Sequence, residues 1–232
     1  TTHTLASLTP PAVCVADVDT ATGSATVQEL QDQHGADNVI FAHCDVTKDE
    51  DFKGAWETTE EKFGKVNLLI NNAGIGNEQN WQKTINVNLG GCMRGTLLAQ
   101  EKLGVNKGGE GGVVVNISSI TGLKAAPLGP IYGATKHAIV GLTRNLGVSL
   151  ALSGVKVQAL CPSLVKTDLL VNSIKSAFST EVAQALINHT ITTAITKTVA
   201  NALMKLLEEG RNGGCMVVEA EKDPYYVDAP LS

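Results

Sequence analysis

Short runs of β-branched and other apolar residues recur along the chain and alternate with longer stretches of helical periodicity. The apolar runs predict strands at 12–16, 38–43, 66–71, 112–118, 155–161 and 215–219. Helical patterns lie between them, at 20–34, 48–63, 81–103, 132–152 and 195–208. Strands that are apolar on both faces and are followed by helices are typical of a parallel sheet covered on both sides. We therefore expect an α/β protein with a doubly wound parallel (Rossmann-like) sheet, forming a single domain over residues 1–232.

Composition narrows the classes of protein that the chain could belong to. A net charge of −5 and 43% apolar residues are typical of a globular chain. The chain has no block of Lys and Arg that would predict nucleic-acid binding, and it has no apolar run long enough to predict a membrane span. The five cysteines are scattered singly and the histidines show no ligand spacing, so neither a disulfide framework nor a metal site is indicated. With no export signal in the N-terminal sequence, we expect a cytoplasmic protein.

Polar residues follow five of the predicted strands. They are Asp17, Asp45, NNAG at 71–74, the pair Ser118–Ser119, and CPS at 161–163. Ligands of open parallel sheets bind outside the carboxyl ends of the strands. Each of these groups taken alone is equally well explained as a turn signal. Together, five strand ends with polar groups are typical of a site for one extended nucleotide.

The stretch SSITGLKAAPLGPIYGATK contains a Tyr four residues before a Lys. One helical turn separates Tyr132 from Lys136, so a helix would present both on one face. An ammonium next to a phenol favours the phenolate and makes it a usable base. The alternative is chance, since Tyr and Lys often occur at this spacing.

These residues and their order resemble those of the short-chain dehydrogenase/reductase family. The likeness extends from about residue 12 to the C-terminus, and it includes Asp17, CDV at 44–46, NNAG at 71–74, Asn88, Ser119, Tyr132, Lys136 and CPSLVKT at 161–167. Each motif is weak alone, whereas NNAG in register with Ser119, Tyr132 and Lys136 is specific. The stretches GNEQNWQKTINVNL and NGGCMVVEAEKDPYYVD further resemble members of the family that act on prostaglandins.

The resemblance implies an NAD-dependent oxidoreductase that interconverts a secondary alcohol and a ketone on a lipophilic, prostaglandin-like small molecule. Tyr132 would exchange a proton with the substrate oxygen, and Lys136 would lower the pKa of the phenol and hold the nicotinamide ribose. Ser119 would hydrogen-bond the reacting oxygen, and Asn88 would anchor a water of the proton relay. The implied cofactor-binding residues are Asp17, Asp45, Val46, Asn72, Ala73, Gly74, Tyr132, Lys136, Pro162, Val165 and Thr167.

The family pattern also leads us to expect a homodimer and an incomplete N-terminus. Small residues on two helices would permit close packing between subunits: Gly90, Gly91, Gly95, Gly133, Ala134, Ala138 and Gly141. The family has a strand, a TGxxxGxG loop and a helix ahead of the run that ends in Asp17, whereas the first glycine here is Gly23. Because that loop binds the pyrophosphate, we expect weak NAD binding. The alternative function is a non-catalytic truncated isoform or fragment that acts, if at all, by association.

Overall fold

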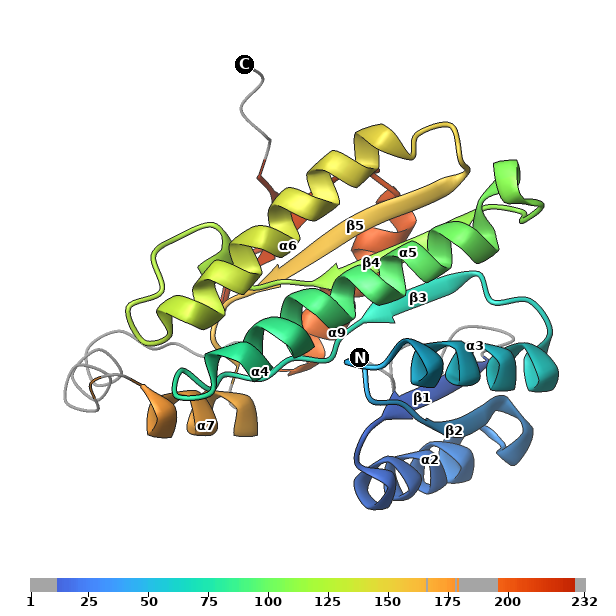
Figure 1. Cartoon of the computed structure of the whole chain (residues 1–232), viewed down its shortest axis with the longest axis horizontal. Coiled ribbons are helices and arrows are strands. Elements are labelled where there is room, and N and C mark those ends of the chain that lie inside the picture. Colours follow the sequence, from blue (N-terminus) through green and yellow to red (C-terminus); the bar gives the residue numbers. More distant parts are fainter. Residues whose placement is uncertain (1–11, 166, 178, 180–195, 228–232) are drawn as a thin grey trace. The chain divides into compact units, whose positions relative to one another are not determined.

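A computed structural model describes residues 12–165, 167–177, 179 and 196–227 (Figure 1). Contacts divide the chain into two compact units, Thr1–Asn67 and Leu68–Ser232, which are described separately below. The single domain over residues 1–232 stays a prediction. Residues 168–178 lie where the resembled family has a segment over the substrate, and the last of them, Phe178, lies outside the described residues.

The first unit is a two-stranded parallel sheet with two helices. Its elements are β1 (Val13–Asp17), α2 (Thr20–His34), the short η1 (Ala36–Asn38), β2 (Val39–His43) and α3 (Asp49–Phe63). The register pairs the last residues of the two strands, Asp17 with His43, so the polar strand ends lie at one edge. Leu30 of α2 packs on Val39 of β2 in the apolar core. Asp19 ends the turn after β1 by accepting the Ala21 and Thr22 N–H groups at the start of α2.

The second unit is built on a five-stranded sheet in the order β3-β4-β5-β6-β7. Its parallel strands are β3 (Leu68–Asn71), β4 (Gly112–Ile117), β5 (Val155–Pro162) and β6 (Cys215–Val218). The last strand, β7 (Tyr225–Tyr226), is antiparallel to β6. The sequence did not predict β7, because two residues are too few to show a periodic pattern.

Helices cover both faces of the sheet in the second unit (Figure 1). The chain provides α4 (Trp81–Ile85), η2 (Asn86–Gly91), α5 (Cys92–Leu103), η3 (Val105–Lys107), η4 (Ile120–Gly122), α6 (Pro130–Ser149), α7 (Asp168–Ser176) and α9 (Thr196–Glu209). In Figure 1, α5 and α6 lie in front of the sheet and α9 lies behind it. The helix predicted from residue 132 begins at Pro130, since a proline fits the first turn, where no N–H partner is needed.

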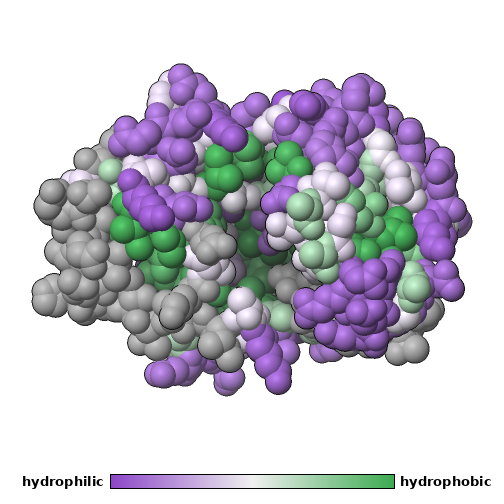
Figure 2. Space-filling model, turned by 90° about the horizontal axis from the view of Figure 1, so that it is seen from below, coloured by the Kyte–Doolittle hydropathy of each residue, from purple (hydrophilic) through white to green (hydrophobic). Residues whose placement is uncertain are grey.

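Apolar side chains of the central strands form the core of the second unit. Val114, Val115, Val157 and Leu160 are fully buried between the helical layers. Figure 2 shows hydrophilic residues over much of the upper and right parts of one face. Polar residues follow the buried strands directly, with Ser118 and Ser119 after β4 and Ser163 after β5.

Candidate active site

The helix α6 carries Tyr132 and Lys136 one turn apart, as the sequence predicted. Lys136 is only 3% exposed, and its Nζ lies 5.4 Å from the centre of the Tyr132 ring. The ammonium donates to the Ile117 carbonyl at 2.8 Å, so it is directed toward the end of β4. The two side chains are thus brought together at the carboxyl end of the sheet.

Ser119 follows β4 directly and joins the same cluster. Its hydroxyl is hydrogen-bonded to the Tyr132 phenol and accepts the Thr121 N–H at 3.2 Å. The next turn approaches α6 very closely, because a Cβ at Gly122 would lie 2.6 Å from the Lys136 carbonyl oxygen. Only a glycine permits this approach, which sets the distance between the Ser119 turn and the helix that carries Tyr132.

Asn88 reaches the cluster from a π-helical segment. The sequence predicted one helix over 81–103, and the structure interrupts it with the π turns of η2. Such turns are rare and occur frequently at functional sites. The buried Asn88 amide accepts the Ile75 N–H at 2.8 Å and donates to the Ile75 carbonyl and to the Thr135 hydroxyl. Asn88 therefore holds the loop after β3 against α6.

Burial dominates the acid–base properties of the cluster. Loss of solvent raises the pKa of Tyr132 to about 12, and the hydrogen bond from Ser119 lowers it only in part. Loss of solvent also lowers the pKa of Lys136 to about 8. We expected Lys136 to lower the pKa of the phenol, whereas in this structure burial of the phenol is the largest influence on that pKa and raises it.

The loop after β3 provides an open surface next to Lys136. Asn72 and Ala73 are exposed. A Cβ added at Gly74 would lie 3.6 Å from both the Lys136 Nζ and the Asn88 Oδ1, so the glycine leaves open a space that a side chain would fill. A flat ring with a ribose hydroxyl suits this surface, because the flanking groups are a cation and an amide.

The end of β5 supplies the remaining predicted residues of this unit. The Pro162 carbonyl accepts from Ser119 at 3.5 Å, which brings β5 to the cluster. The next side chain, Ser163, has a buried hydroxyl without a hydrogen-bond partner among the described residues. Val165 is partly buried, and Thr167 is exposed just before α7. An orphan hydroxyl at a strand end fits a polar ligand such as the nicotinamide amide.

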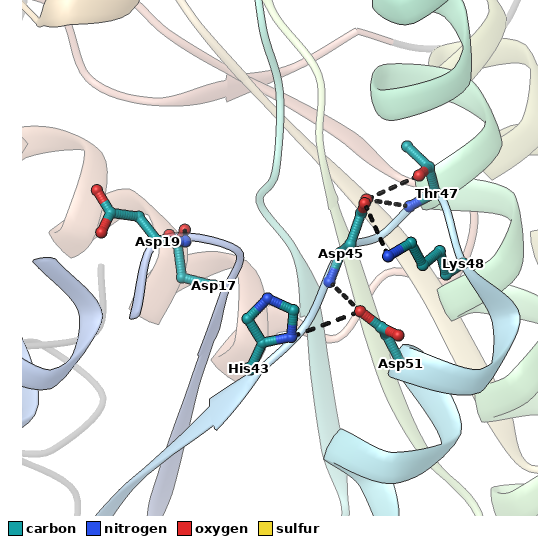
Figure 3. A network of polar contacts seen from close by, with 7 residues as sticks. All are labelled: Asp17, Asp19, His43, Asp45, Thr47, Lys48 and Asp51. Atoms are coloured by element: carbon teal, nitrogen blue, oxygen red, sulfur yellow. Dashed lines mark hydrogen bonds and ion pairs between the residues drawn. The ribbon is translucent and has the colours of Figure 1, made fainter. Parts of the chain in front are cut away.

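The first unit presents a separate group of acidic residues at the ends of its strands (Figure 3). Asp17 is exposed, and its carboxylate accepts the Asp19 N–H at 2.9 Å. Asp45 accepts from the Thr47 N–H and hydroxyl, and these bonds lower the pKa of its carboxyl group. Val46 is partly buried next to it. Asp17 and Asp45 can offer hydrogen-bond acceptors to ribose hydroxyls and an adenine edge.

Sequence reasoning missed Glu78. This carboxylate is 2% exposed and accepts the backbone N–H groups of Ile131 and Tyr132. The sequence contains no signal for the link, because the partners lie 53 and 54 residues further along the chain.

Two kinds of feature do not occur in the described part of the chain. No group of three or more His, Cys, Asp or Glu side chains that could hold a metal ion occurs among these residues. Within the same residues, no helix has the length and apolar character to cross a membrane.

Comparison with known proteins identifies the family. The family model of the short chain dehydrogenases matches residues 3–178. The chain therefore belongs to the short-chain dehydrogenase/reductase family, as the sequence motifs predicted. A crystal structure of a short chain dehydrogenase/reductase from Burkholderia phymatum in complex with NAD superposes with a TM-score of 0.76 at 26% identity, over 90% of this chain and 80% of that one. The predicted Rossmann-like class is confirmed.

Two kinds of dehydrogenase are among the proteins that this chain is similar to. The 15-hydroxyprostaglandin dehydrogenase [NAD(+)] of Rattus norvegicus is 31% identical over 94% of this chain and 85% of its own length. Alcohol dehydrogenase 2 of Ceratitis capitata is 32% identical over 82% of this chain and 75% of its own length. The predicted resemblance to prostaglandin dehydrogenases, the enzyme class and NAD as cofactor are thus confirmed at the level of the relatives.

Proposed function

We propose that this chain is an NAD-dependent oxidoreductase that interconverts a secondary alcohol and a ketone on a lipophilic, prostaglandin-like substrate. One observation carries the proposal: Ser119 after β4 and Asn88 of η2 lie in one cluster with Tyr132 and Lys136 of α6. The contacts join Ser119 to the phenol and Lys136 to the end of β4. An arrangement of hydroxyl, phenol and ammonium is suited to proton transfer at a substrate oxygen.

Each residue has a role that follows from its position. Ser119 donates a hydrogen bond to the reacting oxygen, where charge develops. Tyr132 takes the hydroxyl proton during oxidation and returns it during reduction. Lys136 favours the phenolate through its charge and binds the nicotinamide ribose, while Asn88 holds the loop and a relay water. When bound, oxidised NAD supplies the hydride acceptor and a positive charge, which favours an ionised phenol.

Each of the other predicted cofactor-binding residues would contact a particular portion of NAD. Asn72, Ala73 and Gly74 would lie along the nicotinamide ribose, and Pro162, Val165 and Thr167 would bind the carboxamide. Asp17, Asp45 and Val46 would bind the adenosine and select NAD over NADP, since a carboxylate repels a 2′-phosphate. Five free cysteines support a reducing compartment, so we place the protein in the cytoplasm.

The segment after β5 supports a lipophilic substrate. Leu169, Leu170 and Ile174 of α7 are partly buried, and Val171 is 47% exposed, so apolar side chains of this helix remain accessible. One relative is named a prostaglandin dehydrogenase and another is named an alcohol dehydrogenase. A prostaglandin and a short alcohol are therefore the two substrates to compare.

Turnover with two alcohols tests the proposal. The purified chain is incubated with NAD and either a 15-hydroxyprostaglandin or a short secondary alcohol, and NADH absorbance is followed. We expect NADH with both, and a higher kcat/KM for the prostaglandin. NADH formation with neither alcohol would refute the dehydrogenase assignment, and a preference for the short alcohol would refute the substrate class.

A second candidate function is a non-catalytic protein that binds NAD poorly and acts by association. The strand pairing favours it: among residues 12–165, 167–177, 179 and 196–227, β1 pairs only with β2 and β3 only with β4. Each of these two strands thus keeps one edge without a strand partner among these residues, and an open edge can pair with another chain. Calorimetric titration with NAD separates the two functions. Tight binding supports the dehydrogenase, and absence of binding supports the alternative.

We also propose a homodimer through the face formed by α4, α5 and α6. Apolar side chains of these helices remain exposed: Trp81, Ile85, Met93, Leu97 and Val148. The first four recur at spacings of four and eight along 81–97, as residues on one side of a helical stretch do. The glycine argument is weaker than expected, because a Cβ at Gly133 would clash with Ala126 of the same chain.

Light scattering tests the dimer at micromolar protein concentration. We expect a dimer for the unchanged chain and a monomer for Leu97→Glu, with the exposed Glu101→Gln on the same helix as control. A monomer in the unchanged chain would contradict the proposal.

A further inference from the structure

Glu78, in the loop between β3 and α4, places a buried carboxylate at the start of α6, the helix that carries Tyr132. Glu78 accepts the Ile131 N–H through Oε2 at 2.8 Å and the Tyr132 N–H through Oε1 at 3.0 Å. The side chain is 2% exposed, so water does not compete for these bonds. Both oxygens of one carboxylate thus hold two consecutive amides, and the second amide belongs to the proposed catalytic base.

The start of α6 depends on this carboxylate. Helices leave their first N–H groups without partners, and a side chain at the N-cap usually accepts one of them. The N-cap residue of α6 is Gly129, which makes no such bond. Glu78 takes over this task, and its charge suits the positive end of the helix. A buried carboxylate without these donors would be costly, so Glu78 and the first turn of α6 stabilise each other.

Two contacts tie the same loop to other parts of the site. The Asn88 side-chain amide holds Ile75 twice: its oxygen accepts the Ile75 N–H, and its nitrogen donates to the Ile75 carbonyl. Ser176 of α7 accepts the Glu78 N–H at 3.4 Å and donates to the Gly76 carbonyl at 3.0 Å. The loop therefore contacts the proposed relay residue, the proposed base and the helix that follows β5.

We propose that Glu78 is a positioning residue for the reaction: it fixes the first turn of α6 and thereby the place of the Tyr132 phenol relative to Ser119. The inference rests on the proposed function of Tyr132 as the base. Glu78 acts through the two backbone amides.

Steady-state kinetics of Glu78→Ala and Glu78→Gln provide the first test. Displacing a reacting group by a fraction of an ångström is expected to lower kcat by about 10- to 100-fold. The KM for NAD stays unchanged, because Glu78 contacts none of the cofactor residues other than Tyr132. Glu78→Gln keeps one acceptor oxygen, so its kcat should lie between those of Glu78→Ala and the unchanged chain. Equal kcat in all three, per NAD-binding site, would overturn the proposal.

Gly129 offers a second route to the same carboxylate. A Cβ at Gly129 would lie 3.0 Å from Glu78 Oε1 and 3.4 Å, an ordinary contact distance, from the Tyr132 Cβ. The φ of −155° is accessible to alanine, so the Glu78 carboxylate is the group that must shift. We expect Gly129→Ala to lower kcat in the unchanged chain and to have no effect in Glu78→Ala. Glu101→Gln and Gly54→Ala, which are exposed, serve as matched controls. Additive effects of Gly129→Ala and Glu78→Ala would count against the proposal.

A readout without turnover separates this inference from the proposed function. The chain has three tyrosines, so ring-labelled tyrosine gives few NMR signals, and Tyr132→Phe assigns the relevant one. Glu78→Gln should shift the Tyr132 ring signal and speed amide exchange at Ile131 and Tyr132, while the Tyr225 and Tyr226 signals stay in place. If the Tyr132 signal and both exchange rates equal those of the unchanged chain, the positioning role is wrong, whether or not the protein turns over substrate.

Discussion

Asp17 and Asp45 of the first unit are accessible to water, whereas Lys136 of the second unit is 3% exposed. The Thr47 donors lower the pKa of Asp45 and hold its carboxyl group toward the charged form. Burial moves Lys136 and Tyr132 in the opposite direction, toward their neutral forms.

Under the proposed function, this contrast would separate cofactor recognition from proton transfer. An exposed charge acts on a ligand through Coulomb forces that water weakens, so it can select between cofactors at modest energetic cost. A desolvated phenol or ammonium has a shifted pKa, and small changes in its surroundings then move a proton. The substitutions below change one side of the contrast at a time.

Replacing Tyr132 by Phe should have the largest effect. Loss of a general base lowers kcat by about 10²- to 10⁴-fold. The fold should survive, because the change removes only the phenol hydroxyl and its bond to Ser119, worth about 1 kcal/mol. NADH formation and urea unfolding measure the two effects. Turnover at the original rate would exclude Tyr132 as the base.

Replacing Lys136 by Met should change how stability depends on pH. Lys136 binds its proton more weakly in the folded chain, where burial lowers its pKa to about 8 from the 10.5 of an ordinary lysine. Between these two pKa values the unfolded chain holds more protons, so the Lys136 contribution to the free energy of unfolding rises with pH. The slope is at most about 1.4 kcal/mol per pH unit.

Urea unfolding at several pH values measures the free energy of unfolding of Lys136→Met and of the unchanged chain. The difference between the two free energies isolates the Lys136 contribution. Tyr132, Cys92 and Cys161 have pKa values raised by burial and oppose the rise at high pH, but they are present in both proteins. A difference that stays constant from pH 7 to pH 10 would contradict the buried state of Lys136.

Replacing Asp17 by Ser should shift the preference between cofactors. Removing the carboxylate relieves its repulsion of a 2′-phosphate, and for an exposed pair this is worth about 1 kcal/mol, or roughly fivefold in the affinity ratio. Calorimetric Kd values for NAD and NADP measure the ratio. Asp32→Ser, an exposed change on α2, serves as control and should leave it unaltered.

Replacing Thr47 by Val should have the smallest effect. The hydroxyl donates to Asp45 at 2.8 Å, and the Asp45 side chain is 27% exposed, so the loss is a few tenths of a kcal/mol, discounted for solvent screening. The pKa of Asp45 is lowered in the fold, so this stability exists above the unfolded pKa and is lost as pH falls through the folded one. Urea unfolding at pH 7 and at pH 2.5 should show a difference only at pH 7.

The sequence by itself determined the class of fold, through apolar runs that alternate with helical periods. It also predicted a Tyr and a Lys one helical turn apart, which α6 carries. The candidate roles of Asn88 and Ser119 came from the resemblance to the family and stay predictions. Tertiary structure alone decided the rest, because the remaining features join distant residues. The desolvation of Lys136 requires packing from several elements, and the bond from Glu78 to Tyr132 spans 54 residues. The antiparallel β7 and the π turns around Asn88 likewise arise from packing against neighbouring elements, which no local pattern encodes.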